Sequence, residues 1–197
     1  MIKSALLFDF DGVLVNSEPF YCQLWIGLLK AFDKDFNKYQ LRGKSNAQFL
    51  NQFNLTQRQY DYLLAWKYRL ELEFFENSLI EPTMLKFLID LKSRHKLCIV
   101  SNNKLINIEA FLKSNKCIDL FDFIISEEFG LAPKPSPDAY LKAQELFEIE
   151  KNQAMIIEDS KIGLEAAENA KIDYIKFSQN NLEKSIETIK NALYEYS

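Results

Sequence analysis

Five short apolar runs constrain the fold of this chain more than any other feature of its sequence. Continuous apolar runs are typical of strands in a parallel sheet that is covered on both faces. Amphipathic patterns with helical spacing separate the runs, and this alternation predicts an α/β fold with right-handed crossovers. The runs lie at residues 5–8, 97–100, 123–125, 154–157 and 172–175.

One intervening segment shows both helical spacing and a start signal. Ser136 is a candidate N-cap, and Pro137 stands where the first helical residue is expected. Apolar residues then recur at i, i+4, i+7 and i+8, which predicts one buried helix face. These residues are Ala139, Ala143, Leu146 and Phe147.

The segment from residue 18 to residue 80 breaks the alternation, because it has helical patterns and no good strand. These helices could cover the sheet, or they could form a small inserted domain. We favour the insert, since a direct strand–helix–strand connection needs far fewer residues. The predicted organisation is therefore a core domain of residues 1–17 and 81–197 and a helical cap domain of residues 18–80. Within the cap, Lys67 and Arg69 are expected to be surface charges.

Two acids follow the first apolar run with one residue between them. Asp9 and Asp11 lie where open α/β sheets bind ligands, at the carboxyl end of a strand, and Gly12 allows a sharp turn after them. Period-two alternation would place both carboxylates on one side. Such a pair needs a counter-charge, and Mg²⁺ prefers carboxylate and phosphate oxygens. A solvated loop with an acidic helix cap is the alternative.

Polar residues useful for phosphate chemistry also follow the later strand runs. Ser101 and Asn102 follow the second run, Lys134 comes after the third, and Glu158 and Asp159 follow the fourth. Each could serve only as a cap or a solvated charge. Their joint occurrence at one edge of the sheet instead favours phosphoryl transfer, which requires positioning and charge neutralisation around phosphate oxygens.

Four segments resemble, in order, the signature motifs of the haloacid dehalogenase superfamily. The similarity is to its phosphatase branch with a helical cap, the β-phosphoglucomutase-like group, and it implies a Rossmann-like core with helices on both faces of the sheet. The segments are FDFDGVLVNSE, VSNN, KPSPDAY and IIEDSKIGLEAA, and they span residues 8–167.

The resemblance also implies a role for each candidate residue. Asp9 would be the nucleophile and Asp11 the general acid/base. Ser101, with Asn102 beside it, and Lys134 would bind the phosphoryl group. The Mg²⁺ site would comprise Asp9, the backbone carbonyl of Asp11, and Asp159 with Glu158 beside it.

The stretch LRGKSNAQ interrupts the helical patterns of the predicted cap and has two interpretations. It could be a solvated turn between helices. By the resemblance, it would instead be a loop that reaches the active site and selects the substrate. The residues concerned are Arg42, Gly43, Lys44 and Ser45.

The expected function is that of a Mg²⁺-dependent phosphatase acting on a small phosphorylated metabolite, of the sugar-phosphate kind, through an aspartyl-phosphate. A β-phosphoglucomutase-type phosphomutase is the alternative. Its cap loop resembles Gly-x-Ser-Arg, whereas Asn46 stands at the Arg position here. A non-enzymatic phosphoacceptor signalling domain is less favoured, because such domains lack a helical insert and their late acids do not follow the Lys.

The remaining expectations concern partners and location. The net charge is −4, with Lys and Arg spread along the chain, so no nucleic-acid or membrane surface is expected. The apolar start of the chain is too short for a signal peptide. Cys22, Cys98 and Cys117 follow no metal or redox spacing, which favours reduced thiols in the cytoplasm. We expect a monomer or a weak dimer that binds a small phosphate ester.

Overall fold

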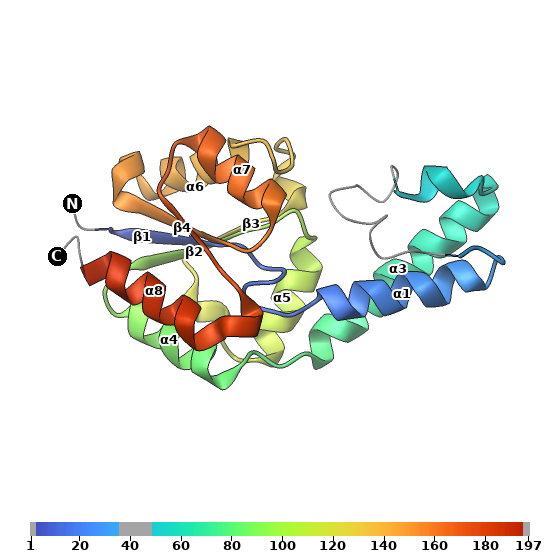
Figure 1. Cartoon of the computed structure of the whole chain (residues 1–197), viewed down its shortest axis with the longest axis horizontal. Coiled ribbons are helices and arrows are strands. Elements are labelled where there is room, and N and C mark those ends of the chain that lie inside the picture. Colours follow the sequence, from blue (N-terminus) through green and yellow to red (C-terminus); the bar gives the residue numbers. More distant parts are fainter. Residues whose placement is uncertain (1–2, 36–48, 195–197) are drawn as a thin grey trace.

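A five-stranded parallel sheet forms the centre of the computed structural model, which describes residues 3–35 and 49–194 (Figure 1). Its strand order is β3-β2-β1-β4-β5. The predicted α/β fold is confirmed. The strands are β1 Ala5–Phe8, β2 Lys96–Val100, β3 Phe123–Ile125, β4 Ala154–Glu158 and β5 Tyr174–Lys176.

The first strand is the middle of the sheet. Its residue Phe8 is in register with Ile99 of β2 on one side and with Ile157 of β4 on the other. All four residues of β1 are buried, as expected for a strand covered on both faces. The three strands therefore end at the same edge, and the loops that follow them meet there.

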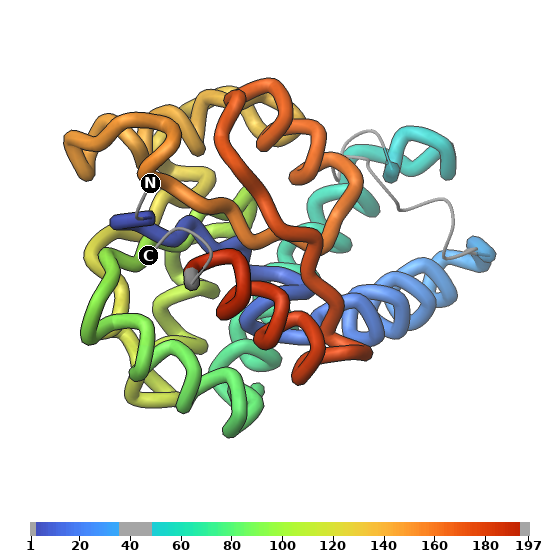
Figure 2. Tube along the Cα trace, turned by 60° about the vertical axis from the view of Figure 1, so that its left-hand side comes forward, coloured from blue at the N-terminus to red at the C-terminus, as the bar shows by residue number. Residues whose placement is uncertain are grey.

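Helices cover both faces of the sheet (Figures 1 and 2). Leu6 and Phe8 point to the face covered by α4 Pro82–Lys92, α5 Leu105–Ser114 and α8 Leu182–Tyr194. Ala5 and Leu7 point to the face covered by α6 Asp138–Phe147 and α7 Lys161–Ala170. Short 3₁₀ helices occupy Asn51–Phe53, Ile118–Leu120, Glu127–Phe129, Lys151–Gln153 and Gln179–Asn181.

The start of α6 differs by one residue from the prediction. Pro137 takes the cap position and Asp138 is the first helical residue. The Ser136 hydroxyl accepts a bond of 3.4 Å from the backbone N–H of Asp138, so it still contributes to the helix start.

Two long helices, α1 Glu18–Lys30 and α3 Gln57–Asn77, run side by side away from the sheet (Figures 1 and 2). A capping box between Thr56 and Gln59 defines the start of α3. The segment has an apolar cluster of its own, made of Trp25, Leu29, Phe49, Leu50, Phe53 and Leu63. Among the described helices, none combines the length and the apolar character that a membrane span requires.

Candidate active site

The predicted site residues of the core come together at the carboxyl ends of the three central strands. Asp9 follows β1, Ser101 follows β2, and Glu158 is the last residue of β4. The backbone N–H of Asp9 still donates to Ile157 O at 3.0 Å, which extends the strand ladder by one residue. The position of Asp9 is therefore fixed by the sheet itself.

Lys134 lies at the centre of the site and is only 7% exposed. Its Nζ donates to Asp9 Oδ1 at 2.8 Å, to Glu158 Oε1 at 2.5 Å and to the backbone oxygen of Val100 at 2.8 Å. Burial alone would lower the pKa of Lys134, but the neighbouring charges, Asp9 foremost, outweigh burial and raise it well above its usual value. The two neighbouring acids thus favour the charged form of the Lys134 ammonium group.

The carboxylate of Glu158 is completely buried, and both of its oxygens have partners. Besides Lys134, its Oε1 accepts a bond of 2.9 Å from the Tyr140 hydroxyl, and its Oε2 accepts bonds from Ser160 Oγ and the Ser160 backbone N–H. Tyr140 was not among the predicted residues. Its place in the motif KPSPDAY, on the same segment as Lys134, could have indicated from the sequence that Tyr140 belongs to the site.

Asp159 differs from Glu158 because one of its oxygens is unused. Its Oδ1 is buried and has no hydrogen-bond partner in the described part of the chain. Oxygen atoms from Asp9, Glu158 and Asp159 lie within 4.8 Å of one another. Burial, and then the charge of Glu158, raise the pKa of Asp159 to about 6. An unpaired buried oxygen among three carboxylates fits a hard divalent cation such as Mg²⁺.

Glycine is required at two positions beside these acids. Gly12 has a φ of +80°, which side chains rarely adopt, and a Cβ there would lie 2.1 Å from Asp159 Oδ2. A Cβ on Gly163 in α7 would lie 1.9 Å from Glu158 Oε1. The two glycines therefore leave the space that the two carboxylates occupy.

Asp11 points to a different set of partners from Asp9. Ser17 Oγ donates to its Oδ1 at 2.6 Å, and Asn103 Nδ2 donates to its Oδ2 at 2.9 Å. Burial raises the pKa of Asp11, and the two hydrogen bonds oppose that rise. An acid held this way is suited to exchanging a proton.

Asn103 organises the loop after β2 and was also missed by the sequence reasoning, which selected its neighbour Asn102. Its backbone N–H donates to Ser101 Oγ at 3.0 Å, and its Oδ1 accepts a bond of 2.9 Å from Asn107 Nδ2. Asn102 Oδ1 accepts a bond of 3.1 Å from the backbone N–H of Lys134. Two adjacent Asn residues gave no sequence signal to distinguish their roles.

Two expectations concerned the cap. Arg42, Gly43, Lys44 and Ser45 lie outside the described residues, so their role as a substrate-selecting loop stays a prediction. The expectation that Lys67 is a surface charge is wrong, because Lys67 is 6% exposed and pairs with the buried Glu71. Arg69 is exposed, and its guanidinium lies 5.2 Å from the ring centroid of Trp66.

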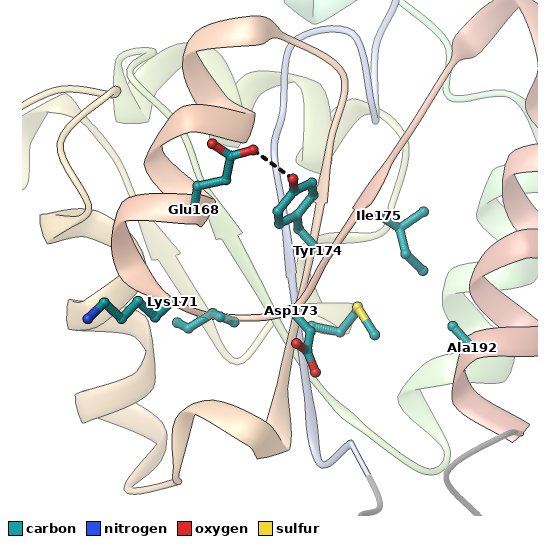
Figure 3. A pocket seen from close by; sticks show the side chains of 8 residues that line it. Glu168, Lys171, Asp173, Tyr174, Ile175 and Ala192 are labelled. Carbon is teal, nitrogen blue, oxygen red and sulfur yellow. Dashed lines mark hydrogen bonds between the residues drawn. The ribbon is translucent and has the colours of Figure 1, made fainter.

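A surface hollow elsewhere contains none of the candidate residues (Figure 3). It lies beside the first residues of β4 and β5, at the opposite edge of the sheet. In it the Tyr174 hydroxyl donates to Glu168 Oε1 at 2.8 Å. The candidate catalytic residues described above therefore lie at the carboxyl edge of the sheet and not at this hollow.

Comparison with known proteins adds a family match. The sequence model of the haloacid dehalogenase-like hydrolases matches residues 6–177. The chain is 26% identical to (DL)-glycerol-3-phosphatase 1, mitochondrial, of Arabidopsis thaliana, covering 91% of this chain and 65% of that protein. It is also 26% identical to a phosphorylated carbohydrates phosphatase of Thermotoga maritima, covering 87% and 83%.

Solved structures share the fold. CbbY from Rhodobacter sphaeroides, in complex with phosphate, superposes with a TM-score of 0.75 at 22% identity, covering 90% of this chain and 87% of that one.

Proposed function

The chain belongs to the haloacid dehalogenase-like hydrolase family, and from this premise we propose that it is a Mg²⁺-dependent phosphatase. Its substrate in this proposal is a small phosphorylated metabolite of the sugar-phosphate class. One observation carries the proposal: two neighbouring carboxylates have different surroundings. Asp9 pairs with the Lys134 cation, whereas Asp11 is held by two neutral donors. Different surroundings assign different tasks to two acids.

Asp9 acts as the nucleophile. Its carboxylate oxygen attacks the phosphorus atom, the bond from phosphorus to the leaving oxygen breaks, and Asp11 gives its proton to that oxygen. Water then attacks the phosphorus of the aspartyl-phosphate while Asp11 accepts a proton from it. This second step releases inorganic phosphate and restores both acids.

Lys134 and Ser101 bind the phosphoryl oxygens, with Asn102 beside them. The Lys134 ammonium donates to two carboxylates and a backbone oxygen, so its charge is in place before the substrate arrives, and one of these three hydrogen bonds is exchanged for a bond to a phosphoryl oxygen. Asp9, Asp159 and the backbone carbonyl of Asp11, with Glu158 beside them, would hold Mg²⁺, whose charge offsets repulsion between carboxylates and phosphate.

We also propose that residues 18–80 form a cap domain on a core of residues 1–17 and 81–197. The separate apolar cluster around Trp25 and Phe49 supports this division. A cap would exclude water from the reacting groups and contact the leaving group. The protein would act on small molecules as a monomer or a weak dimer. It would be located in the cytoplasm, and the three free cysteines support this location.

The mutase alternative is less favoured. A mutase must hold a second phosphate in the cap while the first reacts, and Asn46 cannot clamp a phosphate as an Arg does. Both curated relatives described above are named as phosphatases. Offering β-glucose 1-phosphate with a trace of the 1,6-bisphosphate tests this choice. We expect free phosphate to form faster than glucose 6-phosphate, and the reverse order would make the protein a mutase.

The test of the main proposal uses purified protein and p-nitrophenyl phosphate. We expect hydrolysis with Mg²⁺, loss of hydrolysis in excess chelator, and loss of turnover in Asp9→Asn with the fold retained by circular dichroism. Asp90→Asn, an exposed acid of α4, is the matched control and should behave as wild type. Labelled phosphate trapped on a residue other than Asp9, or full activity in chelator, would contradict the mechanism.

A further inference from the structure

A buried ion pair in α3 is not used by the mechanism above. Lys67 Nζ contacts Glu71 Oε1 one helical turn further along, and the residues are 6% and 2% exposed. An unpaired buried charge is costly, so each member of the pair requires the other. The pair therefore presents no net charge.

The pair belongs to the wall of the site that faces Asp11. Lys67, which pairs with Glu71, has its Nζ 5.8 Å from the centroid of the Tyr21 ring. The Tyr21 hydroxyl is 3.4 Å from Asn103 Nδ2, which donates to Asp11 at 2.9 Å. Tyr21 and Asn103 thus lie between the Lys67–Glu71 pair of α3 and the proposed proton donor.

The proposed leaving oxygen must lie beside Asp11 to receive its proton. Because Tyr21 and Asn103 are the residues between Asp11 and the Lys67–Glu71 pair, the pair lies within electrostatic range of the leaving group.

Lys104, a further cation whose charge acts on Lys67, also has an anionic neighbour. Lys104 Nζ lies 3.5 Å from the centroid of the Tyr68 ring, and its positive charge acts on Glu128. Lys67 and Lys104 therefore each have a negative neighbour, and Tyr21 and Asn103 add hydrogen-bonding groups. Such a wall suits hydroxyl groups better than a second anionic group.

We propose that Glu71 is a specificity-determining residue which, by neutralising Lys67, favours phosphate esters whose leaving group is uncharged over esters whose leaving group is anionic. The inference rests on the proposed phosphatase function and deepens it. If Glu71 were neutral, Lys67 would be a buried cation without its partner, and an anionic leaving group would provide a replacement.

The experiment compares glycerol 3-phosphate, whose leaving group is uncharged, with phosphoglycolate, whose leaving group carries a carboxylate. Their dissociation constants are measured by calorimetry on Asp9→Asn protein with Mg²⁺, where neither ester should be hydrolysed. We expect glycerol 3-phosphate to bind about tenfold more tightly, and Glu71→Gln to shift this ratio about tenfold towards phosphoglycolate. In protein with Asp9 intact, the shift should appear in KM rather than in kcat.

Two variants separate charge from structure. Glu73→Gln, an exposed residue of the same helix, should leave the ratio unchanged. Adding Lys67→Met to Glu71→Gln removes the freed cation and should restore the wild-type ratio, which a merely structural role of Glu71 would not do.

An unchanged ratio in Glu71→Gln would overturn the proposal. If that variant does not fold, tighter binding of phosphoglycolate in the Asp9→Asn protein would overturn it instead. Failure of the phosphatase function itself is seen separately, as absence of p-nitrophenyl phosphate hydrolysis.

Discussion

Gly12 approaches Asp159 so closely that a Cβ atom at position 12 would lie 2.1 Å from Asp159 Oδ2. The Asp159 carboxylate thus occupies the space of a side chain that residue 12 does not have. Residue 12 also has a φ of +80°. The backbone conformation at position 12 and the packing of Asp159, a proposed metal ligand, therefore both require glycine there.

Gly12→Ala should disturb both the turn and Asp159. We expect a loss of about 1–3 kcal/mol in the free energy of unfolding and weaker stabilisation by Mg²⁺. Denaturant unfolding with and without Mg²⁺ measures both effects. Gly27→Ala is the control, because a Cβ on this residue in α1 meets nothing within 4 Å, and it should stabilise the helix by about 0.5–1 kcal/mol. Equal behaviour of the two variants would contradict the close approach.

Lys134→Gln should destabilise the metal-free protein strongly. The substitution leaves Asp9 and Glu158 as buried carboxylates without their shared cation, and breaking a buried pair costs about 3–5 kcal/mol. If Mg²⁺ binds these carboxylates, saturating Mg²⁺ should restore part of the lost Tm. Lys142→Gln, which breaks a surface pair with Glu145, should change Tm little in either condition. A Tm loss in Lys134→Gln that Mg²⁺ does not reduce would show that the ion binds elsewhere.

Stabilisation by Mg²⁺ should increase with pH. The pKa of Asp159 is raised from 3.8 to about 6 in the folded protein. Between these values the unfolded chain has lost the proton and the folded protein retains it, so ionising Asp159 progressively destabilises the metal-free fold as pH rises. Mg²⁺ requires the ionised carboxylate, so its effect should be small at about pH 5 and large at about pH 7.

The measurement for this prediction is Tm in Mg²⁺ minus Tm in chelator across that pH range. Asp159→Asn lacks the titrating group and should show a small difference at every pH. If the Tm difference between Mg²⁺ and chelator falls with rising pH in the wild-type protein, Asp159 is excluded as a Mg²⁺ ligand.

Asn103→Ala should slow the proton transfer assigned to Asp11. It removes the donor at 2.9 Å from Asp11 Oδ2 but keeps the backbone N–H that binds Ser101 Oγ. Hydrogen bonds to charged groups contribute about 1.5–3 kcal/mol, so we expect kcat to fall about tenfold or more, with KM little changed. The pKa of Asp11 should rise, which moves its limb of the pH–rate profile to higher pH.

Asn191→Ala, on the exposed side of α8, is the control for this substitution and should match wild type. An unchanged pH–rate profile in Asn103→Ala would show that Asn103 does not position Asp11.

The strands could be predicted from the sequence because consecutive burial leaves a direct apolar pattern. The last strand shows the limit of that pattern. Ile172 was expected inside it and is buried, yet β5 begins at Tyr174. An apolar pattern in the sequence indicates burial, whereas a strand is defined by its backbone pairing. A buried loop residue and a buried strand residue therefore give the same apolar pattern.

The candidate site was predictable where it follows strands and less so where it depends on helices. Asp9 and Glu158 could be placed at one edge of the sheet from the sequence, because parallel strands end there. Tyr140 and Lys67 were missed or misplaced, because a helix position does not reveal which neighbour its polar end will meet. The i, i+4 spacing of Lys67 and Glu71 was visible, but such spacing is also common on exposed faces.

The central position of β1 affects how this protein folds while it is being synthesised. β1 is made before both of its partner strands, β2 and β4, and the Ser4 hydroxyl donates to the backbone oxygen of Gln153, 149 residues further along the chain. The middle of the sheet cannot close until the ribosome has released the chain as far as β4. Until then the apolar residues of β1 lack their partners, and such segments are prone to aggregation. Slower elongation between β2 and β4 should therefore lower the yield of native protein.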